Sequence, residues 1–338
     1  MSEERLLTIC ALSDRDHTIE RLDRLGIVRP VRLRPGAIRF LLCVILSNRS
    51  RLKMQMRDEA RVFDLIVLGG GPAGLVGATT AAAFGKSVAV VDNHPELGGA
   101  GANTGTVPSK TLRETALALS GARSRNLYGV DLSLRREATV ADFLRHERSV
   151  KTGLNHVLSQ RLDACHTVVY HGTAEFKDPH VIRVRSENGD SSEDLLLQSE
   201  HILIATGSAP VRPPGFPFGS NEVYDSDTIL NLDRLPETMA VIGSGAIGSE
   251  YACTFAALGT KVHMIDGRDV LLSFLDAEVS RALTTAMERN GIVFHWKEKV
   301  VSYGSEPSGG VALKLLSGET LGVEGVLIAV GRKAISTR

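Results

Sequence analysis

Residues 63–74 read Phe-Asp-Leu-Ile-Val-Leu-Gly-Gly-Gly-Pro-Ala-Gly, an apolar strand that runs into a glycine-rich turn. The small residues that follow predict a helix over 75–84, and residues 87–91 predict a second strand that ends at Asp92. This order of strand, turn, helix and strand is a βαβ unit. Its turn has the spacing GxGxxG, which offers backbone N–H groups and a helix N-terminus to a pyrophosphate.

The same pattern occurs a second time, over residues 239–266. A strand at 239–242 leads into the turn Gly-Ser-Gly-Ala-Ile-Gly, a helix through Leu258 and a strand at 261–265. In both copies an acidic residue, Asp92 or Asp266, stands where it can accept a hydrogen bond from an adenosine ribose. The chain is therefore expected to be an α/β protein with two Rossmann-like dinucleotide-binding domains.

Composition excludes several other classes of protein. The 39 basic residues balance the 39 acidic ones, so no nucleic-acid partner is indicated. The four cysteines form no CxxC pair and no metal-ligand spacing, which predicts reduced thiols, no metal and a cytoplasmic location. The apolar run at 40–46 is shorter than the roughly 20 residues that a membrane-spanning helix needs, so no membrane association is expected.

Changes in composition suggest where the domains begin and end. Residues 1–60 show no sustained period, and we expect a poorly ordered or non-native extension, or one short apolar helix at 38–47. A proline-rich crossover at 210–217 separates the two βαβ units. The resulting division is 61–212 for the first dinucleotide-binding domain, 213–325 for the second, and 326–338 for the start of a truncated return segment. Helices are expected from about 108 to 121 and over 140–162, and a polar hairpin over 187–194 between strands at 181–184 and 201–205.

Three further segments are notable. Residues 98–110 read Gly-Gly-Ala-Gly-Ala-Asn-Thr-Gly-Thr-Val-Pro-Ser-Lys. Two apolar strands run into small glycine turns, Ala-Thr-Gly at 205–207 and Ala-Val-Gly-Arg at 329–332. Taken one by one these turns are ordinary strand ends, but their order relative to the two βαβ units is informative.

The order of these five motifs resembles the two-dinucleotide flavoprotein disulfide reductases, the family of dihydrolipoamide dehydrogenase and glutathione reductase. In that family the first fingerprint binds FAD and the second binds a nicotinamide nucleotide. By this resemblance the FAD residues include Gly69, Gly71, Gly74 and Asp92, and those for NAD(H) or NADP(H) include Gly243, Gly245, Gly248 and Asp266. The other cofactor-binding candidates are Pro72, Ala73, Gly99, Thr106, Lys110, Thr206, Gly207, Ala246, Ile247, Glu250, Arg268 and Gly331.

One departure from the family pattern bears on the chemistry. The disulfide reductases carry two cysteines in the form GGxCxxxxCxPSK, but here Gly101 and Thr106 occupy those positions. Neither residue forms a thiolate, so electrons cannot pass from the flavin to a disulfide substrate by the family's usual route. The soluble, Si-specific NAD(P)+ transhydrogenases resemble the chain more closely, in the run from Asn103 and in Gly-Arg-Asp-Val-Leu-Leu-Ser-Phe-Leu-Asp-Ala-Glu at 267–278.

The resemblance implies FAD-dependent hydride transfer between NADPH and NAD+ without a redox-active disulfide. It places Lys110 and Glu250 as an ion pair beside the flavin, and these are the catalytic candidates. His180, His263 and His295 each lie on a β-like stretch and are expected to be core or surface residues. The family's C-terminal dimerisation domain is expected to be absent, so a homo-oligomer is expected of full-length relatives and not of this chain.

Two questions stay open at this level. Asp266 favours NAD over NADP, whereas Arg268 could meet a 2′-phosphate or be a solvated surface residue. Two other flavin activities also remain: a thiol-free NAD(P)H dehydrogenase that reduces a quinone or dye, and a dihydrolipoamide dehydrogenase-like oxidoreductase with another acceptor. A truncated, non-catalytic nucleotide-binding fragment is the alternative from a different class.

Overall fold

A computed structural model describes residues 60–124, 140–185, 194–305 and 310–335. The predicted extension before residue 60, including its helix at 38–47, falls outside the described residues, and so does nearly all of the predicted hairpin at 187–194.

The first βαβ unit forms a four-stranded parallel sheet with the strand order β4-β3-β2-β8. Its strands and the helix after the first of them are β2 (Leu65–Leu68), α4 (Pro72–Ala83), β3 (Val88–Asp92), β4 (Val168–His171) and β8 (His201–Ile204). The central strands are apolar up to Asp92, the last residue of β3, because both faces of the sheet are covered. On one face Val67 and Val90 pack with Leu75 of α4, while Ile66 and Val91 belong to the core of the other face.

A second four-stranded sheet covers that other face. Its strands are β1 (Arg61–Val62), β5 (Thr173–Asp178), β6 (Val181–Arg185) and β7 (Leu195–Gln198), in the order β1-β7-β6-β5. Ile182, Val184 and Leu197 project from it into the core shared with β2 and β3. Sequence analysis found only one of these strands, because most of the others carry polar or charged residues and are partly exposed.

The second half of the described chain repeats this three-layer plan. A five-stranded parallel sheet has the order β10-β17-β11-β12-β13, with its strands at β10 (Val223–Asp225), β11 (Thr238–Ile242), β12 (Lys261–Asp266), β13 (Val293–Trp296) and β17 (Gly325–Ile328). The helices of this half are α8 (Ala246–Ala257), α9 (Ala277–Arg289) and the single 3-10 turn η1 (Thr228–Asn231). An antiparallel sheet follows, made of β14 (Val300–Ser305), β15 (Val311–Leu315) and β16 (Thr320–Val323).

Alternation along the central strand β11 divides its side chains between two cores. Met239 and Val241 pack with Phe255 of α8, whereas Ala240 packs with Leu313 of the antiparallel sheet. This division follows from the period of two in a strand. The parallel sheet is therefore sandwiched between helices and an antiparallel sheet, like its counterpart in the first half.

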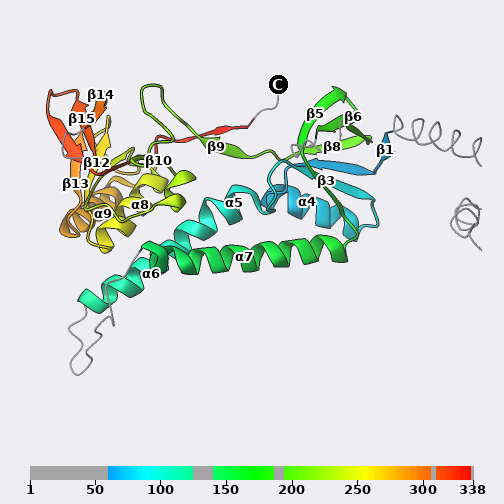
Figure 1. Ribbon diagram of the computed structural model, residues 1–338, viewed down its shortest axis with the longest axis horizontal. Helices are drawn as coiled ribbons and strands as arrows, with labels where there is room; N and C mark the ends of the chain where they lie inside the picture. The colour runs from blue at the N-terminus through cyan, green and yellow to red at the C-terminus, as the bar shows by residue number, and fades with distance from the viewer. Residues whose placement is uncertain (1–59, 125–139, 186–193, 306–309, 336–338) are drawn as a thin grey trace, which may run out of the picture. The chain divides into compact units, whose positions relative to one another are not determined.

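Three helices and one strand pair complete the fold (Figure 1). The helices are α5 (Gly99–Asn103), α6 (Thr106–Ser124) and α7 (Val140–Ala164), and the strands are β9 (Ser208–Pro210) and β18 (Arg332–Ala334). Helix α6 packs against both α7 and α8, and β9 pairs antiparallel with β18. The α6–α8 and β9–β18 contacts join segments that lie more than a hundred residues apart in the chain.

Most predicted elements are present, with shifted ends. Helix α4 begins at Pro72, three residues before the predicted start, because proline at the first helical position has no N–H that needs a partner. Helix α5 was missed, since its sequence of glycine, alanine and asparagine has no amphipathic period. The domain boundaries stay a prediction, although β17 pairs with β10 and β11 and so belongs to the second parallel sheet.

Candidate functional site

The three glycines of the first fingerprint have different surroundings. Gly69 has a φ of +108°, and a Cβ there would collide with the carbonyl oxygen of Ala205. A Cβ on Gly74 would collide with the carbonyl oxygen of Gly69, so this glycine permits close packing of α4 on β2. At Gly71 the nearest atom to an added Cβ is the Cα of Gly99, 3.8 Å away. Gly71 thus leaves open space at the N-terminus of α4.

The second fingerprint repeats these roles. Gly243 has a φ of +105° and would clash with the carbonyl oxygen of Ala329, and Gly248 would clash with Gly243. At Gly245, the residue before α8, an added Cβ would meet no atom within 4 Å. In both copies the middle glycine therefore opens the helix N-terminus to a ligand, while the outer two allow the turn and the packing.

Three cavities lie along these turns. The first cavity has a volume of about 390 Å³ and follows the first fingerprint; it is lined by Gly69, Gly71, Pro72, Ala73, Asp92, Gly99, Thr206 and Gly207 among others. The second cavity, about 660 Å³, follows the second fingerprint; it is lined by Gly243, Gly245, Ala246, Ile247, Asp266, Arg268, Lys299 and Gly331 among others. The junction cavity, about 320 Å³, is lined by Gly101, Thr104, Thr106, Lys110, Ser226, Ala246, Ile247, Glu250 and Arg332 among others.

The junction cavity shares walls with both of the others. Gly101, Thr104 and Arg332 also line the first cavity. Ala246 and Ile247, at the start of α8, also line the second cavity. A ligand end that leaves either fingerprint cavity can therefore enter the same small space.

An ion pair lies in the wall of the junction cavity. Lys110 and Glu250 are each the fifth residue of their helices, α6 and α8, which pack together. Lys110 Nζ donates to Glu250 Oε1 at 2.5 Å, and the two side chains are 53% and 45% exposed. The predicted pair is thus formed by tertiary contact between residues 140 positions apart. Its place beside a flavin stays a prediction.

The two acidic residues that follow the fingerprints have unequal partners. Asp92 accepts hydrogen bonds from the backbone N–H groups of Gly70 and His94, at 2.5 and 2.7 Å. Asp266 is bound by the Arg268 guanidinium, with Nε to Oδ1 at 2.9 Å and Nη2 to Oδ2 at 2.8 Å. Burial by itself raises the pKa of Asp266, but hydrogen bonds from Arg268 and Ser244 outweigh burial and hold that pKa far below its usual range.

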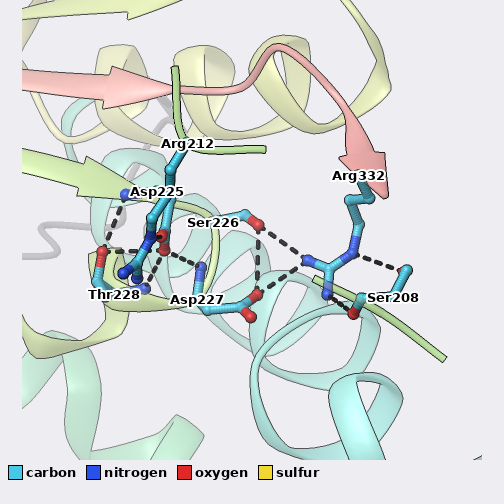
Figure 2. Close-up of polar contacts among 7 residues, drawn as sticks. All are labelled: Ser208, Arg212, Asp225, Ser226, Asp227, Thr228 and Arg332. Carbon is cyan, nitrogen blue, oxygen red and sulfur yellow. Dashed lines mark hydrogen bonds and ion pairs between the residues drawn. The ribbon is translucent and has the colours of Figure 1, made fainter. Parts of the chain in front are cut away.

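Arg332 joins the strand pair to the turn after β10 (Figure 2). Its guanidinium donates to Ser208 O at 2.6 Å and Ser208 Oγ at 3.1 Å. It also reaches Asp227 Oδ1 at 2.9 Å and Ser226 Oγ at 3.1 Å. This arginine is the last residue of the motif at 329–332, but it was not among the predicted binding residues. Nothing in the sequence around Asp227 marked that residue as a partner.

A second carboxylate of Figure 2 organises the same turn. Asp225 is fully buried; its Oδ1 accepts from Thr228 N at 2.8 Å and its Oδ2 from Arg212 Nε at 2.7 Å. Burial alone raises the pKa of Asp225, but the hydrogen bonds from Thr228 and Arg212 lower it overall. This carboxylate fixes the chain just before Ser226 and Asp227.

Two predicted binding residues lie outside the cavity walls. Gly74 and Gly248, the third glycine of each fingerprint, line none of the three cavities and instead allow helix–strand packing. Every other predicted cofactor-binding residue lines at least one of them.

The two cysteines in the described part of the chain lie elsewhere. Cys165 and Cys253 are free thiols, and neither lines any of the three cavities. Gly101 and Thr106, at the family's cysteine positions, both line the junction cavity.

The three histidines singled out from the sequence, His180, His263 and His295, line none of the three cavities. His263 on β12 and His295 on β13 contact each other, with Nδ1 and Nε2 3.0 Å apart, and burial together with the neighbouring His295 lowers the pKa of His263. The prediction that His180 lies on a strand is wrong: it lies in the turn between β5 and β6, where its ring contacts Ser199 O at 3.2 Å.

Neither a metal site nor a membrane-spanning helix is present in the described ranges. Within them, no three His, Cys, Asp or Glu residues gather closely enough to hold a metal ion. Among the helices of those same ranges, none combines the length and the apolarity that crossing a membrane requires.

Comparison with known proteins supports the predicted resemblance. The family model for pyridine nucleotide-disulphide oxidoreductases matches residues 63–337. The soluble pyridine nucleotide transhydrogenase of Mycobacterium tuberculosis is 40% identical over 278 residues, which cover 81% of this chain and 58% of that protein. The protein of the same name from Chromohalobacter salexigens is 37% identical over 270 residues, covering 80% and 57%.

Solved structures agree with the fold. The HOCl-induced flavoprotein disulfide reductase RclA from Escherichia coli has a TM-score of 0.69 at 26% identity, covering 81% of this chain and 57% of that one. Its Cu(II) complex has a TM-score of 0.70. The chain spans a little under three fifths of the length of these relatives. The predicted α/β fold class is confirmed, and the chain belongs to the pyridine nucleotide-disulphide oxidoreductase family.

Proposed function

We propose that this protein catalyses FAD-dependent hydride transfer between NADPH and NAD+ without a redox-active disulfide. The observation that carries the proposal is the junction cavity, which shares walls with both fingerprint cavities and contains the Lys110–Glu250 ion pair. The names of the transhydrogenase relatives support the same activity.

The fit to two dinucleotides rests on the middle glycines. Gly71 and Gly245 leave open space at the N-termini of α4 and α8, where a side chain would stand in the path of a pyrophosphate. Asp92 keeps acceptor capacity for a ribose hydroxyl beside the first of these openings. The first cavity would hold FAD and the second cavity the nicotinamide nucleotide.

When bound, FAD supplies the hydride chemistry, accepting a hydride from one nicotinamide and returning it to another. The ammonium of Lys110 places a fixed positive charge in the junction cavity, which stabilises negative charge that develops there. Glu250 holds that ammonium in position through the 2.5 Å hydrogen bond. Hydride transfer needs no general base, which fits the position of His180, His263 and His295 outside the three cavities.

Two residues of the junction cavity support the thiol-free route. Gly101 and Thr106 occupy the positions at which disulfide reductases carry cysteines, and neither residue has a thiol that could exchange electrons. The hydride would then be passed to a second nicotinamide nucleotide and not to a disulfide. Free thiols at Cys165 and Cys253 fit a cytoplasmic location, which belongs to the same proposal.

A single preparation of the full chain tests the function. We expect the purified protein to show a flavin absorption spectrum after incubation with FAD, and to catalyse NADPH-dependent reduction of thio-NAD+. A colourless protein that retains no FAD would contradict the proposal. Faster reduction of lipoamide or of a quinone than of thio-NAD+ would assign the flavin site to one of the other two oxidoreductase activities.

A further inference from the structure

The carboxylate of Asp266 has no acceptor position left for a ligand. It receives five hydrogen bonds, from Ser244 N, Ser244 Oγ and three nitrogens of Arg268 including its backbone N, at 2.7 to 2.9 Å. Two carboxylate oxygens offer about four lone-pair directions in all. Its side chain is also 8% exposed. A ribose hydroxyl therefore finds no free acceptor at Asp266.

Arg268, in contrast, has hydrogen-bond donors that its partners in the described chain do not use. A guanidinium carries five N–H groups. Here Nε and Nη2 each donate once to Asp266, and Nη1 donates once to Ser273 Oγ at 3.1 Å. Two N–H groups therefore have no partner among the described residues, and the side chain is 49% exposed on the wall of the second cavity. At this end of the second cavity, the guanidinium of Arg268 can therefore bind a ligand and the carboxylate of Asp266 cannot.

The first fingerprint provides an internal comparison. Asp92 stands in the same position after its own glycines, but it receives only two hydrogen bonds from described residues, both from backbone N–H groups. No arginine or lysine of the described chain pairs with it. Asp92 thus keeps a full charge and free lone pairs, whereas the charge of Asp266 is cancelled by Arg268.

Two further charged side chains face the second cavity. Lys299 is exposed, lies over Gly267 and has no acidic partner within the described ranges, and Glu298 accepts from Ser317 N at 3.2 Å. With Asp266 and Arg268 these groups sum to no net charge. A phosphate would meet two cations there, one of them unpaired.

We propose that Arg268, rather than Asp266, reads the 2′ position of the adenosine ribose, so that one site accepts both NAD(H) and NADP(H). A 2′-phosphate takes the two free N–H groups while the pair with Asp266 stays intact. A 2′-hydroxyl accepts from one of the same N–H groups and meets no repulsion. This inference rests on the proposed function, because hydride transfer between NADPH and NAD+ requires a site that tolerates both.

Equilibrium binding of NADP+ and NAD+ to the full chain, by calorimetry, tests the inference without relying on turnover. We expect Arg268→Gln to weaken NADP+ binding by about tenfold to hundredfold, because a charge-assisted contact is lost and the Asp266 charge is released. NAD+ binding should change by less than about threefold. Adding Asp266→Asn to Arg268→Gln should restore part of the NADP+ affinity, since the released charge is then absent.

Arg281→Gln, an exposed arginine on α9, is the matched control and should leave both affinities unchanged. Equal losses for NADP+ and NAD+ in Arg268→Gln would overturn the inference while leaving the proposed function intact. A wild-type protein that binds FAD but neither nucleotide would overturn the proposed function, and this inference with it.

Discussion

Lys110 is the single side chain on which the proposed chemistry depends most. We expect Lys110→Met to slow flavin reduction by NADPH at least tenfold, because a fixed charge beside the reacting groups stabilises the transition state more than it stabilises the fold. Stopped-flow measurement of flavin absorbance checks the rate. The free energy of unfolding should change by less than about 1 kcal/mol, since the ion pair is half-exposed.

The matched control for this substitution is Lys314→Met, which removes an exposed lysine on β15 far along the chain. It should leave the rate of flavin reduction unchanged. Wild-type rates in Lys110→Met would show that the ammonium has no part in hydride transfer.

Asp225 should make folding sensitive to acid. Its pKa is lower in the folded protein than the ordinary value of about 4, so the unfolded chain binds more protons as the pH falls. The stabilising contribution is therefore complete above about pH 4 and is lost as the pH falls towards the lower folded-state pKa.

Asp225→Asn tests whether this carboxylate causes the loss of stability at low pH. It should cost about 1–3 kcal/mol at neutral pH, because an amide N–H would replace an acceptor facing Thr228 and Arg212. It should also flatten the dependence of unfolding free energy on pH below about 4. Urea unfolding measured across this pH range gives both quantities; a variant with the wild-type slope would contradict the assignment to Asp225.

At the scale of the strand–turn–helix element, the glycines of one fingerprint should separate folding from binding. Gly248→Ala forces a Cβ against the carbonyl oxygen of Gly243, and overpacking of this kind costs about 1–3 kcal/mol. Gly245→Ala meets open space at a favourable backbone angle, φ −79°, so the unfolding free energy should hardly change. Its methyl group should nevertheless weaken NAD+ binding by obstructing the helix N-terminus.

Urea unfolding and NAD+ calorimetry on the two variants form the test, and each variant is the control for the other. Equal destabilisation in both would mean that Gly245 is a packing residue like Gly248. Undiminished NAD+ affinity in Gly245→Ala would show that the pyrophosphate does not approach this glycine.

At the scale of the whole molecule, Arg332 connects structures that sequence separates. It ties Ser208 of β9 to Asp227 after β10 and lines both the first cavity and the junction cavity, but not the second cavity. We expect Arg332→Gln to weaken FAD binding and to slow flavin reduction by NADPH, while NAD+ binding is retained. Fluorescence titration with FAD and calorimetry with NAD+ check the two halves of this expectation.

Arg234→Gln is the matched control, because Arg234 makes an exposed ion pair with Glu324 that should contribute little. If Arg332→Gln weakened NAD+ and FAD binding alike, the arginine would be supporting the fold as a whole.

The sequence predicts the local features of this protein well. Both fingerprints carry their information in neighbouring residues, since a strand, three glycines and an acid at fixed spacing specify a βαβ unit without reference to the rest of the chain. The family and the fold class followed from these motifs and their order, and all but two of the predicted cofactor-binding residues line a cavity. Most of the antiparallel strands did not, because β5 is polar and partly exposed and β16 is only four residues long, and both depend on pairing with neighbouring strands.

Only the tertiary structure decided how the local features meet. The approach of Lys110 to Glu250 depends on packing between α6 and α8, and the Arg332 contacts depend on the pairing of β9 with β18. The partnership of Arg268 with Asp266 joins residues only two apart, yet it depends on the local turn after β12, in which the backbone N–H of Arg268 also donates to Asp266 Oδ1. The sequence spacing places an acidic residue after each glycine turn. The hydrogen-bond donors around that residue determine whether its carboxylate can bind a ligand, because an oxygen that already accepts all the hydrogen bonds it can within the protein accepts none from a ligand.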